Sequence, residues 1–403
     1  MADLLFLAHR IPFPPDRGDK IRSFHMLQAL SRRARVHLAC FADDEADAGH
    51  LAGLRQALGG ALGEAHVEVR RVSRPLAALK ALATGRPLSV TLFDSSALHG
   101  AVQRLLAERP IGTVVAFSSQ MAQYVPAGGR RRFVMDFVDM DSAKFADYAA
   151  AGGPLRLVHA REARRLLAWE RATADRADAS LFVSDAEAAL FRTRACARRV
   201  TAIGNGVDLA GFRPGAVAAE PTGEGPVILF TGQMDYRPNI AAVCAFAADV
   251  LPLIRAERPD ARFVIAGRAP STEVQRLAGP AVQVTGAVPD MRSWLAAAHV
   301  VVAPLAIGRG VQNKVLEAMA MARPVVASTA AFTGIDAEPG RDLLVADGVA
   351  DQARAVLGLL ADPTAAGAIG RAARVAMERS YSWDARLARL SELAGLPPLR
   401  DAA

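Results

Sequence analysis

Short runs of apolar and β-branched residues alternate with segments of helical periodicity along almost all of the 403-residue chain. In the first half, strands are expected at residues 3–8, 35–41, 66–72, 112–117, 131–138 and 179–184. Strands that alternate with helices are typical of a parallel sheet with helices on both faces. The pattern therefore predicts an α/β, doubly wound fold.

The alternation stops once and then resumes. Residues 205–226 are rich in Gly and Pro and lack periodicity, which predicts an interdomain linker. Further strands are then expected at 227–232, 261–267, 282–286, 299–304 and 324–328. We predict two Rossmann-like domains, 1–204 and 227–381, with an amphipathic helix at 382–396 that returns to the first. A ligand is expected in the cleft between them, at the carboxyl ends of the strands.

The formal net charge of +7 indicates anionic partners such as nucleotide-sugars, phospholipid headgroups or nucleic acid. No recognition helix or aromatic–basic platform is evident, which disfavours nucleic acid. The three cysteines are far apart and are expected to be reduced and buried. No run of 18 apolar residues occurs, and the first apolar run is expected to be a strand and not a signal peptide. We expect a cytoplasmic protein whose membrane contact, if any, is peripheral.

Glycines collect at the expected strand ends of the second domain. A glycine lets backbone N–H groups approach an anion closely, so this collection predicts a nucleotide diphosphate site, with ordinary turns as the alternative. The glycines are Gly232, Gly267, Gly286, Gly308 and Gly310.

A helix expected from Val311 carries two charges on one face, Lys314 and Glu317. Its free N–H groups and Lys314 suit a diphosphate, and the Glu317 carboxylate suits the two hydroxyls of a ribose. The alternative is a surface ion pair worth a few tenths of a kcal/mol. The rest of the segment is apolar and leads into a strand after Pro324, which indicates burial and favours the ligand site.

The segment "HVVVAPLAIGRGVQNKVLEAMAMARPVVAS" (299–328) resembles the signature of glycosyltransferase family 4, an enzyme class of GT-B fold. Further landmarks resemble the family in its order: "ERATADRADASLFVS" (170–184), "NGVD" (205–208), "FTGQMDYRPN" (230–239) and "YSW" (381–383). The resemblance implies a nucleotide-sugar donor, retention of anomeric configuration, no metal or other cofactor, and Glu317 on the ribose. Residues 9–27 and 134–149 resemble a subgroup associated with exosortase/PEP-CTERM exopolysaccharide systems.

The chain departs from the family pattern at three positions. Arg309 stands where a second Glu often touches the donor sugar, Gln233 where an Arg is expected, and Asn239 where a Lys is expected. Lys314 and Arg237 are therefore the residues predicted to stabilise phosphate charge. Arg309 is a further candidate, for the phosphates or for an acidic group on the donor or acceptor. The predicted donor contacts are Glu317, Gly232, Gln233, Asn205, Gly267, Arg309, Gly310, Val311 and Gly18.

Two segments of the first domain are expected on the acceptor side. In "PFPPDRGDKIRS" (12–23), Gly18 resembles the flexible family loop that covers the reacting sugar. This loop is either a lid or a solvated charged turn. In "DFVDMDS" (136–142), Asp139 is predicted to orient or deprotonate the acceptor hydroxyl, with N-capping by Asp139 or Asp141 as the alternative. The two-domain pattern argues against a D-x-D metal site there. Other acceptor-side candidates are His9, Asp16, Lys20 and Asp136.

Five basic residues flank the apolar segment "PLAALKALA" (75–83): Arg70, Arg71, Arg74, Lys80 and Arg86. They form either a solvated face or a surface that docks on an anionic inner-membrane leaflet, where a lipid-linked acceptor would lie.

The sequence thus predicts a retaining, hexosyltransferase-like enzyme of exopolysaccharide biosynthesis, acting on a glycan or lipid-linked acceptor. The alternatives are a sugar-nucleotide epimerase of GT-B fold and a non-catalytic sugar-nucleotide or glycan-binding protein.

Overall fold

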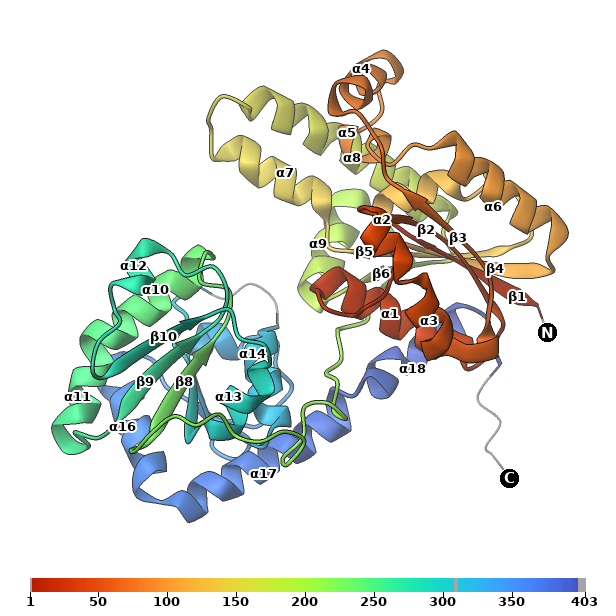
Figure 1. Ribbon diagram of the computed structural model, residues 1–403. Helices are drawn as coiled ribbons and strands as arrows, with labels where there is room; N and C mark the ends of the chain where they lie inside the picture. The colour runs from red at the N-terminus through yellow and green to blue at the C-terminus, as the bar shows by residue number, and fades with distance from the viewer. Residues whose placement is uncertain (1, 308–310, 398–403) are drawn as a thin grey trace, which may run out of the picture. The chain divides into compact units, whose positions relative to one another are not determined.

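The computed structural model describes residues 2–307 and 311–397. The chain forms two compact units, one of Met1–Asn205 with Arg386–Ala403 and one of Gly206–Ala385. Each unit is a parallel sheet covered by helices (Figure 1), which confirms the predicted α/β fold of two Rossmann-like domains.

The first unit has a seven-stranded parallel sheet in the order β3-β2-β1-β4-β5-β6-β7. The strands are β1 Asp3–Ala8, β2 Val36–Ala42, β3 Leu62–Val69, β4 Ile111–Phe117, β5 Arg132–Val138, β6 Ala179–Phe182 and β7 Val200–Ala202. The helices are α1 Gly18–Ser31, α2 Glu45–Gly49, α3 Leu51–Leu58, α4 Arg74–Thr84, α5 Leu88–Thr91, α6 Ser96–Glu108, α7 Asp141–Ala150, α8 Arg156–Arg176 and α9 Asp185–Ala195, with 3-10 turns at Gly59–Ala61 and Ser119–Tyr124. The central strands are buried on both faces, as their unbroken apolar runs require.

The second unit has a six-stranded parallel sheet in the order β10-β9-β8-β11-β12-β13. The strands are β8 Val227–Thr231, β9 Arg262–Ala266, β10 Val282–Gly286, β11 Val300–Ala303, β12 Val325–Ala327 and β13 Leu344–Val345. The helices are α10 Arg237–Ala245, the π-helical turn η3 Phe246–Val250, α11 Leu251–Glu257, α12 Thr272–Gln275, α13 Met291–Ala297, α14 Asn313–Ala320, α15 Thr329–Phe332, α16 Val349–Ala361 and α17 Pro363–Ser380. The last helix, α18 Trp383–Leu393, begins in the second unit and continues into the first.

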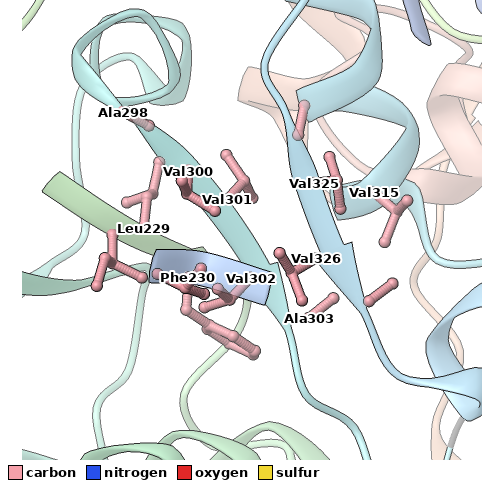
Figure 2. Close-up of a cluster of buried hydrophobic side chains, with 14 of the residues drawn as sticks. Leu229, Phe230, Ala298, Val300, Val301, Val302, Ala303, Val315, Val325 and Val326 are labelled. Atoms are coloured by element: carbon pink, nitrogen blue, oxygen red, sulfur yellow. The ribbon is translucent and has the colours of Figure 1, made fainter. Parts of the chain in front are cut away.

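The core of the second unit fixes the position of α14. Figure 2 shows Val315 of this helix beside Val325 and Val326 of β12, with the side chains of β8 and β11 continuing the cluster. Val315 is fully buried, and so is Met319 one turn later. The apolar face of α14 is therefore packed on the sheet. Because α14 follows β11 along the chain, its first turn lies on the side of the carboxyl ends of the strands.

The segment that was expected to be a linker is held on the second unit. Val207 pairs with Ser382, and the guanidinium of Arg374 donates to the carbonyls of Leu209 and Phe212. The chain returns from the second unit to the first between Ala385 and Arg386, inside α18. Residues after this helix are anchored on the first unit, where Thr113 Oγ1 donates to the carbonyl of Ala394 over 2.9 Å.

Residues Arg237–Glu257 form one continuous helical run whose length and mean hydropathy of 1.6 would suffice to cross a membrane. In the structure Val243, Phe246 and Ile254 of this run are buried in the core of the second unit. The run is therefore explained as a core helix.

Candidate functional site

Two glycines shape the carboxyl end of the second sheet. Gly232 follows β8 with φ 154° and Gly267 follows β9 with φ 155°. A Cβ on Gly267 would lie 1.6 Å from the carbonyl oxygen of Gly232, so the two loops pass in contact and only glycine fits. A Cβ on Gly232 would lie 2.8 Å from Asn239 Nδ2 and 3.2 Å from Lys314 Nζ. The glycines thus make room for polar side chains at this edge.

Lys314 lies in the first turn of α14, which begins at Asn313, two residues later than expected. Its Nζ donates to Asn239 Oδ1 over 2.6 Å and stands 4.2 Å from the centre of the Phe230 ring. Asn239 Nδ2 in turn donates to the carbonyl of Gln233 over 2.8 Å. Burial lowers the pKa of Lys314 to about 8, which Glu317 opposes. The ammonium is thus hydrogen-bonded to a neutral partner, and Glu317 compensates its charge only in part.

Glu317 lies on the same face of α14, one turn further along the helix. Burial raises the pKa of its carboxyl to about 7, against the attraction of Lys314. Among the residues that the structure describes, none donates a hydrogen bond to this carboxylate. Because Lys314 bonds to Asn239 instead, the alternative of a simple Lys–Glu surface pair does not describe the geometry. A half-buried carboxylate of this kind can accept hydrogen bonds from two hydroxyl groups of a ligand.

The other predicted donor residues of the second unit lie around this centre. Arg237 is exposed at the first turn of α10, and Val311 packs against the core. The exposed Gln233 accepts from the guanidinium of Arg268 when its amide oxygen faces that group. Arg268 was missed by the sequence reasoning, although its place directly after Gly267 is a usable signal. Arg309 and Gly310, with Gly308, lie outside the described residues.

A buried ion pair underlies the strand ends of the first unit. Arg22 Nε donates to Asp136 Oδ2 over 2.9 Å, and both side chains are almost fully inaccessible. The guanidinium also donates to the carbonyl of Ile203 over 2.8 Å and to Asn205 Oδ1 over 2.9 Å. Asp136, predicted on the acceptor side, is thus enclosed, and Asn205, predicted at the donor, contacts Arg22. Sequence reasoning missed Arg22 because a basic residue in a charged segment resembles a solvated one.

This ion pair is connected to Asp139 through strained backbone. Asp136 Oδ1 accepts the N–H of Val138 over 2.9 Å, and Val138 has φ 69°, which is unfavourable for a β-branched residue. Asp139 follows with a half-exposed side chain, and its Oδ2 accepts from Lys144 Nζ over 2.8 Å. The buried pair therefore fixes the direction in which the Asp139 carboxylate leaves the sheet.

The N-capping alternative for Asp139 and Asp141 is wrong. Helix α7 has Met140 at its N-cap and no side-chain cap of its own. Distant carboxylates take the free N–H groups instead: Glu187 accepts from Met140 over 2.7 Å and Glu170 from Ser142 over 3.1 Å. Asp139 and Asp141 both accept a hydrogen bond from the ammonium of Lys144. Among residues 2–307 and 311–397, no group of three or more His, Cys, Asp or Glu could hold a metal ion.

His9 is buried at the end of β1, with its ring stacked on Phe117 at 5.7 Å. Asp19 Oδ2 lies 3.2 Å from His9 Nε2 and accepts from Arg10 Nη1 over 2.7 Å. Although burial raises the pKa of Asp19, the hydrogen bonds from His9 and Arg10 hold it well below its usual range. Asp19 is therefore a carboxylate that fixes this loop.

The predicted loop residues divide into buried and exposed ones. Lys20 is buried, and its Nζ donates to Asp47 Oδ1 over 2.5 Å, so it points into the protein. Asp16 and Gly18 are exposed. Gly18 has no positive φ, and a Cβ there would meet nothing within 4 Å. The fold therefore does not require glycine at position 18, which leaves a close approach of ligand as a reason for it.

Comparison with known proteins points to one group. Residues 225–362 match the family model described as glycosyl transferases group 1. The phosphatidyl-myo-inositol mannosyltransferase of Mycolicibacterium smegmatis is 33% identical over 191 residues, which are 45% of this chain and 47% of the relative. The chain thus matches about half the length of this curated relative. The site around Lys314 and Glu317 lies inside the segment that the family model matches.

Solved structures resemble the chain over nearly its whole length. Sucrose-phosphate synthase from Thermosynechococcus elongatus has a TM-score of 0.65 at 18% identity, with 97% of this chain and 98% of that chain covered. The Anabaena protein HepE, in complex with UDP, has a TM-score of 0.63 at 15% identity, with 97% and 98% covered. The fold is therefore GT-B.

Proposed function

We propose that this protein is a glycosyltransferase that moves a sugar from a nucleoside diphosphate donor to a glycan or lipid-linked acceptor. The observation that carries the proposal is the pairing of Lys314 and Glu317 at the carboxyl end of the second sheet. Each group is half-buried, and burial shifts the pKa of each toward its neutral form. An anionic diphosphate beside Lys314 and ribose hydroxyls on Glu317 would stabilise both charges.

The residues have distinct roles in this reaction. Glu317 holds the ribose, while Gly232 and Gly267 let the diphosphate approach the backbone. Lys314, Arg237 and the N–H groups of α14 stabilise the charge that grows on the phosphates as the glycosidic bond breaks. The departing diphosphate removes the acceptor proton in a retaining reaction without metal, and Asp139 orients the acceptor hydroxyl.

The comparisons suggest which substrates to try first. HepE is described in complex with UDP and with UDP-glucose, so UDP-sugars are our first proposed donors. The curated relative is a phosphatidyl-myo-inositol mannosyltransferase, which supports a lipid-linked acceptor. We assign the protein to the cytoplasm, at the inner face of the membrane, and to exopolysaccharide biosynthesis of the PEP-CTERM type.

A nucleotide-release screen tests this proposal. UDP-, GDP- and dTDP-sugars are each incubated with the protein and with lipid-linked or soluble glycan acceptors, and Glu317→Ala is run beside it. Acceptor-dependent release of one nucleotide, lost in Glu317→Ala, supports glycosyl transfer. Conversion of the donor sugar without acceptor indicates an epimerase, and nucleotide binding without turnover on any acceptor indicates a binding protein. Either of these outcomes overturns the proposal.

A further inference from the structure

Helix α4 presents its apolar side chains outward. Leu76, Leu79 and Leu82 are 66%, 64% and 66% exposed, whereas the buried residues of the helix are Ala77 and Ala81. The three leucines are spaced three residues apart and therefore form one stripe along the helix. A helix on a soluble surface normally shows the opposite arrangement, with leucines inward.

The orientation of α4 is fixed by bonds on its inner face. Thr91 Oγ1 donates to the carbonyl of Ala77 over 3.1 Å, and Arg161 Nη2 donates to the carbonyl of Ala81 over 2.6 Å. These bonds tie α4 to α5 and α8, which lie beside it in Figure 1. The leucine stripe is therefore held outward by the fold.

The start of α8 carries further exposed apolar side chains. Leu155, Leu157 and Val158 are 56%, 82% and 50% exposed. Leu157 precedes Arg161 by four residues, about 6 Å along the helix, and so lies on the same side of α8 as Arg161. We name the six residues the leucine surface: Leu76, Leu79, Leu82, Leu155, Leu157 and Val158.

Basic residues lie beside the leucine surface. Four of those in segment 70–86 pair with carboxylates: Arg70 with Asp43, Arg71 with Glu45, and both Lys80 and Arg86 with Asp94. Arg74 has no acidic partner among the residues that the structure describes. On α8, Arg164 and Arg165 are exposed, whereas the acidic Glu162, two residues before Arg164, is buried and accepts from the N–H groups of Leu88 and Ser89. An apolar area flanked by cations complements an anionic lipid bilayer, in which a negatively charged headgroup layer covers an apolar interior.

We propose that the leucine surface inserts into the headgroup region of an anionic lipid bilayer and docks the first unit on it. Leucines enter the acyl boundary, while Arg74, Arg164 and Arg165 contact lipid phosphates. Docking requires neither the donor site nor its chemistry, and it therefore stands or fails independently of the proposed transfer reaction.

Vesicle binding of the full-length protein, without any substrate, tests the proposal. We expect co-sedimentation with vesicles of phosphatidylcholine and phosphatidylglycerol, and much weaker binding to phosphatidylcholine alone. The triple variant Leu76→Ser, Leu79→Ser, Leu82→Ser should bind about a hundredfold more weakly. The variant Arg74→Gln, Arg164→Gln, Arg165→Gln should lose the preference for anionic vesicles and the sensitivity to salt.

A matched control uses exposed apolar residues of the other unit. Leu253→Ser with Val375→Ser changes side chains that are 45% and 59% exposed and should leave binding unchanged. Circular dichroism and thermal melting confirm that each variant is folded. Absence of vesicle binding, or equal loss in the control, overturns the proposal. So does self-association that the leucine variant abolishes, because the surface would then join two copies of the chain.

Discussion

Charged side chains lie at the strand ends of both units, but their bonding partners differ. In the first unit, Arg22 bonds to Asp136 and Lys20 to Asp47, so each of these two buried cations has its counter-charge within the protein. In the second unit, Lys314 bonds to a neutral amide, and burial pushes the pKa of both Lys314 and Glu317 toward the neutral form. The first set stabilises the fold, whereas the second holds charge that a ligand would compensate.

Breaking the first-unit pair should have the largest effect on stability. Arg22→Met leaves the carboxylate of Asp136 buried without its cation and should lower the free energy of unfolding by about 3–5 kcal/mol. Urea denaturation measures this. Lys144→Met, which removes the exposed partner of Asp139, should cost less than about 1 kcal/mol. Equal losses in the two variants would remove the distinction between a buried positioning pair and a surface pair.

Removing the second-unit cation should affect turnover instead. Lys314→Met keeps the apolar contact with Phe230 but deletes the charge, and we expect kcat/KM for the donor to fall about a hundredfold or more. Stability should change little or rise, because a half-buried charge is lost. Steady-state kinetics and a urea melt on one preparation separate the two effects. A large loss of stability with unchanged turnover would show that Lys314 stabilises the fold, as Arg22 and Lys20 do, and does not act in turnover.

The pH dependence of stability should also distinguish the regions. The pKa of Lys314 is lowered in the folded chain to about 8 from its ordinary value of 10.5. Between about pH 8 and pH 10.5 the unfolded chain therefore binds more protons than the folded chain, and stability rises with pH. The pKa of Glu317 is raised in the folded chain to about 7 from its ordinary value of 4.5. Between about pH 4.5 and pH 7 the folded chain therefore binds more protons than the unfolded chain, and stability falls as the pH rises. Relative to the double variant Lys314→Met, Glu317→Gln, the protein should be least stable near pH 7–8, by about 1–3 kcal/mol. Parallel stability curves for the two proteins contradict this.

The smallest expected effect concerns a glycine of the first unit. Gly18→Ala meets no neighbour and should raise stability by up to about 0.5 kcal/mol. If ligand approaches this backbone, turnover falls by less than about tenfold while the variant stays folded. Gly267→Ala is the contrasting variant, because the added Cβ would overlap the carbonyl of Gly232. This substitution should lower the free energy of unfolding by about 3 kcal/mol. An unchanged rate in Gly18→Ala removes position 18 from the site.

Much of the fold could be predicted, because strand and helix periods are local properties of the sequence. The strands β1, β4, β8 and β11 are continuous apolar runs, and the strand ends of the second unit are marked by Gly232 and Gly267. Strands β7 and β13, of three and two residues, are too short to show a period. Segment 205–226 has the composition of a linker, and only tertiary contacts show that it lies on the second unit.

The candidate site was predictable to a different extent in each unit. Lys314 and Glu317 are three residues apart on one helix, so their shared face follows from the helical period. Arg22 and Asp136 are 114 residues apart, and no local pattern pairs them. The same limit applies to Glu170 and Glu187, which bind the N–H groups at the start of α7 from distant positions. Periodicity shows that α4 is apolar on one side but not that this side faces outward.

The central claim is that Glu317 binds the ribose of a nucleoside diphosphate. Isothermal titration of UDP and 2′-deoxy-UDP into the protein, into Glu317→Ala and into Glu257→Ala tests it most directly. We predict that the parent and Glu257→Ala, which changes an exposed carboxylate, prefer UDP by about tenfold. Glu317→Ala should bind both nucleotides weakly and equally. If Glu317→Ala binds UDP as tightly as the parent and keeps the preference for the ribose hydroxyl, the assignment of this site is wrong.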